Sequence, residues 1–193
     1  MIDGSSSGES INLFAVVAYL PQPLAGFVDA LRDELAPGCR LRAHLTILPP
    51  RQIAGNSELA SQELQRVLQE VRSFQVSVGE VWVFPISDVV HIAVETGREQ
   101  LRELHVRMNQ GLSKAPELWR YHPHITLAQA LEPSAVRPAC ELATRRWREY
   151  SGLRSFSIDH LTFVRRTLET REGGTDTPWV DLTTLELLSP VLA

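Results

Sequence analysis

Cysteine is scarce in this sequence and positive charge is not in excess, and both shortages limit what the protein can be. Cys39 and Cys140 are the only cysteines in 193 residues. Two thiols do not make a disulfide framework, so we expect both to be free in a reducing compartment. The formal net charge is -4 and the pI is near 5.9. Broad binding along nucleic acid needs a basic surface, so any nucleic-acid substrate should be short and held locally.

Long hydrophobic runs are also missing. The apolar stretch that follows Ile11 ends at Pro21 and is too short to cross a bilayer as a helix. Residues 1–10 are rich in Ser and Gly and lack the basic segment that opens a secretory signal. We therefore expect residues 1–10 to be a disordered tail. The protein is expected to be a cytoplasmic monomer without a membrane association or a protein partner.

Apolar periodicity predicts alternating strands and helices. The continuous apolar run at 11–20 predicts a strand buried on both faces. Apolar residues at helical spacing predict a helix from Leu24 to Leu35, which Pro37 and Gly38 should end. Alternation predicts a strand at 40–48 that ends at two prolines, and Thr96 with Glu99 resembles a capping box. Further helices are expected near 57–71, 96–112 and 136–147, and further strands near 74–84, 89–95, 120–129, 155–166 and 178–188.

Two of these strands share an unusual polar face. In the strand at 40–48, His44 and Thr46 point away from Leu45 and Ile47, because successive strand residues face opposite sides. In the strand at 120–129, His122, His124 and Thr126 share one face with Arg120, and Tyr121, Ile125 and Leu127 point the other way. Each strand thus carries a His-x-Thr triplet on its polar, solvent-facing side.

The elements around the two triplets recur in the same order, which indicates an internal duplication. We predict an α+β class and a bilobal fold in which two antiparallel sheets face a central cleft, with helices on the outside. Residues 11–193 should form one domain. Its first lobe is expected at about 11–86 and its second at about 87–193, related by a pseudo-twofold axis.

Two histidines and two threonines suit metal-free cleavage of a phosphodiester. The reaction needs a base for the attacking oxygen, an acid for the leaving oxygen and donors for the phosphoryl oxygens. Imidazole titrates near neutrality, so His44 and His124 can supply the base and the acid. Thr46 and Thr126 point the same way as their histidines and can donate hydroxyl protons. One triplet is a weak signal, but two at equivalent places in a duplicated layout predict an active site.

The segments His44-Leu45-Thr46-Ile47 and His124-Ile125-Thr126-Leu127 resemble the signature of the 2H phosphoesterases. That superfamily includes RNA 2',5'-ligase-like proteins and 2',3'-cyclic nucleotide phosphodiesterases. The resemblance implies an enzyme, without metal or cofactor, that hydrolyses 2',3'-cyclic phosphates or hydrolyses and joins 2',5'-phosphodiesters of nucleotides or short RNA. It also implies an acid and base pair of histidines and phosphate-binding threonines. Ligase-like members carry an arginine shortly after the second motif, where this chain has Gln129.

Three neighbours of the motifs are candidate substrate-binding residues. Arg42 shares a face with His44 and suits neutralisation of a phosphate, although the alternative is a solvated rim charge. His122 borders the second motif. Tyr121 suits stacking on a base, although an aromatic residue in a strand more often packs in the core. His91, His105 and His160 are expected to be structural.

Two other functions compete with metal-free catalysis. A binding module would hold a nucleotide or an RNA end without turnover, yet binding alone does not require two titrating groups. A metallohydrolase could use His122 and His124, because two histidines at this strand spacing can chelate a metal. No recognisable spacing supplies the further ligands, so no metal is expected.

Overall fold

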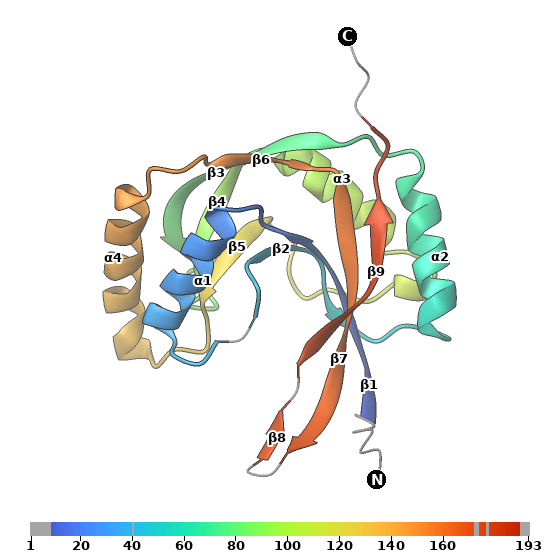
Figure 1. The fold of residues 1–193 in the computed structure, drawn as a ribbon, viewed down its shortest axis with the longest axis horizontal. Helices are drawn as coiled ribbons and strands as arrows, with labels where there is room; N and C mark the ends of the chain where they lie inside the picture. Colours follow the sequence, from blue (N-terminus) through green and yellow to red (C-terminus); the bar gives the residue numbers. More distant parts are fainter. Residues whose placement is uncertain (1–8, 40, 172–173, 177, 190–193) are drawn as a thin grey trace, which may run out of the picture.

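The computed structural model describes residues 9–39, 41–171, 174–176 and 178–189. Two antiparallel sheets lie in the middle of the molecule and the long helices lie outside them (Figure 1). This is the predicted α+β class with two facing sheets. Within the described residues, no helix combines the length and the apolar character needed to cross a membrane.

The first sheet has the order β2-β1-β7, with β9 paired to the far side of β7 and the short β8 extending its end. β1 is central, and its side chains divide between the main core and a small second cluster, so the predicted burial on both faces is confirmed. β1 begins at Glu9, so residues 9 and 10 belong to a strand and not to the expected tail; residues 1–8 lie outside the described part. The strands are β1 (Glu9–Tyr19), β2 (His44–Arg51), β7 (His160–Arg171), β8 (Gly174–Asp176) and β9 (Trp179–Glu186).

The second sheet has the order β5-β4-β3-β6. Its strands are β3 (Phe74–Val83), β4 (Val90–Thr96), β5 (His124–Ala128) and β6 (Ser155–Ile158). The expected boundary between lobes at residue 86 is therefore wrong for the sheets, because it separates β3 from its neighbour β4. β3 pairs with β4 along the chain, and β7 returns to pair with β1 in the first sheet. Each sheet thus takes strands from both halves.

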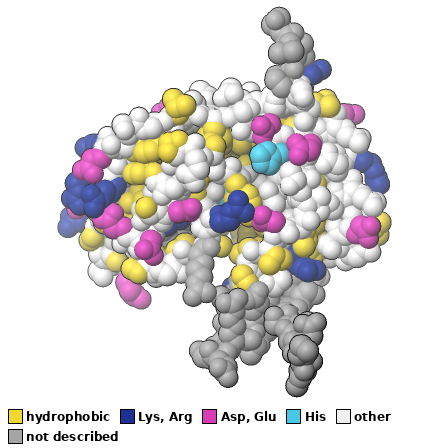
Figure 2. Space-filling model, viewed as in Figure 1, with side chains coloured by type: hydrophobic (Ala, Val, Ile, Leu, Met, Phe, Trp, Pro, Cys, Tyr) yellow, Lys and Arg dark blue, Asp and Glu magenta, His cyan; other side chains and the backbone are white. Residues whose placement is uncertain are grey.

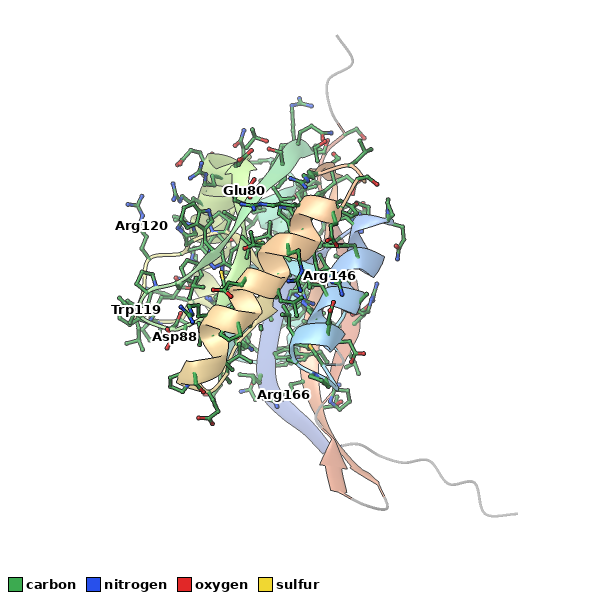
Figure 3. All side chains as sticks on the ribbon, turned by 90° about the vertical axis from the view of Figure 1, so that its left-hand side faces the viewer. Glu80, Asp88, Trp119, Arg120, Arg146 and Arg166 are labelled. Carbon is green, nitrogen blue, oxygen red and sulfur yellow. The ribbon has the colours of Figure 1, made fainter. Side chains whose placement is uncertain are left out.

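The helices interlock the two sheets. α1 (Leu24–Leu35) and α4 (Pro133–Glu149) pack on the second sheet, whereas α2 (Ser57–Leu68) and α3 (Arg98–Met108) pack on the first. After β1 of the first sheet, the chain therefore passes over the second sheet as α1 and then returns to the first sheet as β2. Figure 3 shows Arg146 of α4 beside α1, where its guanidinium binds the carboxylate of Glu34 at 2.7 and 3.0 Å.

The outer surface agrees with the low positive charge of the chain. Figure 2 shows basic side chains gathered at the left edge of one face, where α4 lies in Figure 1, with acidic side chains among them. On the described part of this face, no broad basic area covers the sheets. An extended electrostatic track for nucleic acid is therefore not formed there.

Three boundary predictions fail for identifiable reasons. β2 continues through Pro49 and Pro50, because it is an edge strand and can lose backbone donors on its open side. α3 starts after Gly97, and the Thr96 hydroxyl donates to the Ser77 hydroxyl at 2.8 Å instead of capping the helix. The expected strand at 155–166 breaks at residue 159, so β6 and β7 enter different sheets.

Candidate active site

The two His-x-Thr triplets lie on the edge strands β2 and β5, which contact each other between the sheets. His44 and Thr46 are partly exposed while Leu45 and Ile47 are fully buried. β5 has the same alternation, with partly exposed His124 and Thr126 on one face. The local strand geometry therefore presents both triplets away from the core.

Both imidazoles are held by the same hydrogen bond. Nδ1 of His44 lies 2.6 Å from the carbonyl oxygen of Arg42, and Nδ1 of His124 lies 2.7 Å from that of His122. A carbonyl oxygen only accepts, so each Nδ1 carries a proton. Each Nε2 is then the nitrogen left to act as acceptor when the ring is neutral and as donor when it is charged. This is the nitrogen that acid–base chemistry requires.

Arg32 of α1 links β5 to the segment that leads into β2. Its side chain is buried, with the residue 3% exposed. Nε donates to the carbonyl of Thr126 at 2.8 Å, and Nη1 donates to the carbonyls of Leu41 and Arg42 at 3.2 and 3.1 Å. The Arg42 carbonyl that orients His44 is therefore also held by Arg32. Sequence reasoning missed Arg32, although a charged residue next to Leu31 on the buried face of α1 was a usable signal.

Burial shifts the titration of both catalytic candidates. Burial is the largest of the causes that lower the pKa of His44 to about 4, and the charges of Arg32 and His124 contribute to the same shift. Burial also lowers the pKa of His124, with a smaller contribution from the charge of His122. Because the charge of His124 is among the causes that lower the pKa of His44, the two rings lie within electrostatic reach of each other. Both rings are therefore neutral at neutral pH in the free protein.

Aromatic contacts surround His124. The Phe84 ring stacks on His91 with centroids 3.9 Å apart and meets His124 edge-on at 4.9 Å. His91 is only 2% exposed, and burial lowers its pKa to about 4. Phe84 also meets His122 edge-on at 5.4 Å. Three histidine rings thus surround a phenyl ring. Among the residues that the structure describes, no group of three or more His, Cys, Asp or Glu side chains is placed to hold a metal.

The three predicted substrate-binding residues have different surroundings. Tyr121 donates its hydroxyl to the carbonyl of Thr46 at 2.7 Å, and its ring stacks on His105 at 4.1 Å. Tyr121 therefore lies behind the motif strand and does not offer its ring to a base, which corrects the prediction. His122 is exposed, and burial together with the charges of Arg102 and Arg98 lowers its pKa. His122 still borders the second motif.

The two arginines near the motifs, Arg42 and Arg120, also have different surroundings in the structure. Arg42 precedes β2, but it lies over the ring of Tyr19 and pairs with Asp181 at 3.0 Å, and Tyr19 is the cross-strand partner of His44. Arg120 is exposed, and Figure 3 shows it extending outward from the molecule. The expected strand at 120–129 is only β5, His124–Ala128, and the residues before it form a loop. Arg120 therefore does not share a strand face with His124.

A buried polar network supports the loop before β5. His105 is 4% exposed; its Nδ1 lies 2.7 Å from the carbonyl oxygen of Ile47 and its Nε2 2.8 Å from Glu117. Arg51, at the end of β2, binds the same Glu117 carboxylate at 2.7 Å. The network ties the loop to β2, and the stacked ring of Tyr121 links it to Thr46. Its members lie far apart in sequence, and no local pattern announced them.

Comparison with known proteins decides the family. The model of the 2'-5' RNA ligase superfamily matches residues 20–170, which is well over half of the chain. The chain belongs to this superfamily. A protein of Oceanobacillus iheyensis that carries the name phosphoesterase is 26% identical to this chain over 124 residues. The match covers 62% of this chain and 71% of that protein. It is therefore a distant relative along most of its length.

Solved structures show the same fold. The apo form of E. coli LigT has a TM-score of 0.62 at 17% identity, over 95% of this chain and 99% of LigT. LigT in complex with 3'-AMP has a TM-score of 0.58 at 15% identity, over 94% and 99% of the two chains. Kluyveromyces marxianus Usb1 has a TM-score of 0.53 at 15% identity, over 92% and 99%. This 2'-5' RNA ligase superfamily member thus shares the fold of LigT over nearly its whole length.

Proposed function

We propose that this chain is a metal-independent phosphoesterase that opens 2',3'-cyclic phosphates, or hydrolyses and rejoins 2',5'-phosphodiesters, in nucleotides or short RNA. The observation that carries the proposal is the matched orientation of His44 and His124. Both donate Nδ1–H to a carbonyl two residues earlier, and both leave Nε2 available on adjoining edge strands. A phosphate between them would have a proton acceptor on one side and a proton donor on the other.

His44 is the base in our assignment for ring opening. Burial and the positive charge of Arg32 keep its ring neutral, so Nε2 can accept a proton from water. The water oxygen attacks phosphorus as one ribose P–O bond breaks. His124 gives its proton to the departing ribose oxygen, while the hydroxyls of Thr46 and Thr126 donate to the non-bridging oxygens. In the joining direction, the two histidines exchange these roles.

The substrate itself supplies the charge that the acid needs. Burial lowers the pKa of His124 in the free protein, so its ring is neutral before substrate binds. An anionic phosphate close to the ring favours the imidazolium form and raises this pKa. Binding therefore couples to proton uptake, which prepares His124 as the acid.

The named complexes of a related fold agree with a nucleotide phosphate as ligand. E. coli LigT has been solved with 3'-AMP and with phosphate. A 3'-nucleotide is a product of opening a 2',3'-cyclic phosphate, so this ligand chemistry supports the proposed substrate class.

The test is turnover of 2',3'-cyclic nucleotides and 2',5'-linked dinucleotides in excess chelator. We expect wild-type turnover to persist in chelator and to show a bell-shaped dependence of kcat/KM on pH. Because the histidine pKa values are lowered, the bell should lie on the acid side of neutrality. Loss of activity in chelator would favour the metallohydrolase. Saturable binding of these nucleotides without any turnover would favour the binding module.

A further inference from the structure

The guanidinium of Arg42 contacts two residues from different strands, Tyr19 and Asp181. Its guanidinium carbon lies 3.6 Å from the centroid of the Tyr19 ring, and Nη1 lies 3.0 Å from Oδ2 of Asp181. The Tyr19 hydroxyl donates to the other carboxylate oxygen of Asp181 at 2.5 Å. We call Arg42, Tyr19 and Asp181 the Arg42 platform. Two of these contacts position the guanidinium, and the third joins its two partners to each other.

The Arg42 platform stands beside the first motif on the same face of the first sheet. Tyr19 of β1 is the direct partner of His44 of β2, and partners across antiparallel strands point the same way. Behind the platform, Ala15, Val17 and Val164 form an apolar cluster separate from the main core, and Tyr19 packs against it. The platform therefore has a rigid apolar backing and a position next to the catalytic imidazole.

The outer side of the platform is open to a ligand. The Arg42 side chain is 63% exposed and that of Asp181 is 46% exposed. Tyr19 covers the guanidinium from one side, and most of the remaining surface of the side chain is open to solvent. A planar group that binds beside His44 would meet the guanidinium of Arg42 there.

The charge balance of the platform suits a base better than a phosphate. The Asp181 carboxylate already neutralises Arg42, and it would repel a second anion at the same guanidinium. Guanidinium planes stack on unpaired nucleobases, and stacking does not use the hydrogen-bonding edge that Asp181 occupies. Arg42 was expected to neutralise phosphate; its contacts favour a different part of the substrate.

We propose that the Arg42 platform is the nucleobase subsite, which stacks the base of a nucleotide whose phosphate lies between His44 and His124. This inference rests on the proposed function for the position of the phosphate. It adds a residue that distinguishes nucleotides from phosphate esters without a base. The platform selects planarity and not a particular base, because a stacked guanidinium reads no base edge.

The test measures binding, so it does not depend on turnover. NMR titration of the histidine ring signals would give Kd values for 3'-AMP and for inorganic phosphate, and their ratio measures what the nucleoside contributes. In wild type we expect 3'-AMP to bind more tightly. In Arg42→Leu, the advantage of 3'-AMP should fall about tenfold, as when a stacking partner of a base is removed. Arg137 on α4, exposed and paired with nearby Glu141, provides the control: Arg137→Leu should leave the ratio unchanged.

Arg42→Lys separates the plane from the charge. Lysine keeps the positive charge but has no planar group, so we expect it to lose the 3'-AMP advantage as Arg42→Leu does. If Arg42 held the phosphate, Arg42→Leu would weaken both ligands equally and Arg42→Lys would restore both. That result, or equal wild-type affinities for the two ligands, would overturn the nucleobase subsite. The turnover assay with cyclic nucleotides judges the proposed function separately, since it asks for hydrolysis in wild type and not for a change in this ratio.

Discussion

The two His-x-Thr triplets are alike in backbone geometry and different in surroundings. His44 and His124 both donate Nδ1–H to the carbonyl two residues earlier. Behind His44, however, Arg32 binds the same Arg42 carbonyl and places a fixed positive charge near the ring. Around His124 the neighbours are Phe84 and His91. One local motif has thus been placed in a cationic setting and in an aromatic one.

The difference in surroundings explains how two copies of one motif can take different roles, one as base and one as acid. A fixed cation disfavours a second positive charge, so the ring near Arg32 is better suited to remain neutral and act as base. The ring among aromatic neighbours has no such fixed cation among the causes that lower its pKa, and His122, which does lower it, is itself titratable. Four experiments test whether the two triplets have these roles and surroundings.

The largest effect should come from the histidines themselves. His44→Gln and His124→Gln should each reduce kcat about a thousandfold or more, because each removes a proton-transfer group. A substrate with a good leaving group, such as a 4-nitrophenyl phosphodiester, needs little help from an acid. It should therefore restore much of the rate in His124→Gln and little in His44→Gln. Equal rescue of both variants in single-turnover assays would contradict the assigned roles.

Removing Arg32 should affect stability and the titration of one site. Arg32→Met leaves the carbonyls of Leu41, Arg42 and Thr126 without this donor, and we expect the free energy of unfolding to fall by about 3 kcal/mol. The pKa of His44 should rise, since a nearby positive charge is lost, and the acid limb of kcat/KM should move to higher pH.

Urea unfolding and a pH–rate profile measure these two changes. The matched control is Arg107→Met, which removes an exposed arginine paired with Glu103 on α3 and should change the free energy of unfolding by less than about 1 kcal/mol. A loss in Arg32→Met no greater than in this control would mean that Arg32 does not connect the two motifs.

The threonines should give a smaller and symmetrical effect. Thr46→Val and Thr126→Val keep the shape of the side chain and remove one hydroxyl donor each, so kcat/KM should fall roughly ten- to a hundredfold. Thr144→Val on α4 is a control away from the cleft. If only one of the two threonine variants is impaired, the two triplets do not share the phosphate.

The smallest effect should appear in stability at acid pH. The folded-state pKa of His91 is about 4, below the ordinary value of about 6.5. The unfolded chain therefore binds more protons between these values, and stability is lost as the pH falls from about 6.5 towards 4. His91→Gln should reduce the loss between pH 7 and pH 4.5 by about 1 kcal/mol or more. An unchanged loss in urea unfolding at the two pH values would show that His91 does not contribute.

Local sequence patterns predicted most elements well where burial follows a period. α1 ends at Leu35, as its apolar spacing and the following Pro37 indicated. The strand at 155–166 failed, because nothing in its alternation shows that residue 159 separates two sheets. The boundary at residue 86 failed for a related reason. Which strands share a sheet depends on pairing between distant segments, and a single-strand pattern does not contain that pairing.

The candidate site was predictable to the extent that it depends on side-chain alternation. Thr46 and Thr126 follow their histidines by two positions, so strand geometry alone places each pair on one face. Arg32 could have been found as a charge on an apolar helix face. His105, Arg51 and Glu117 could not, because their contacts join segments that the sequence keeps apart.

Alternation along the chain places two histidines and two threonines, the groups of the proposed chemistry, at the spacing of a strand face. The tertiary structure decided how those groups differ. It brought β2 against β5, placed Arg32 behind one triplet and Phe84 beside the other, and packed Tyr121 against His105. Alternation is a property of neighbouring residues, whereas burial and charge at an imidazole depend on segments that only folding brings together.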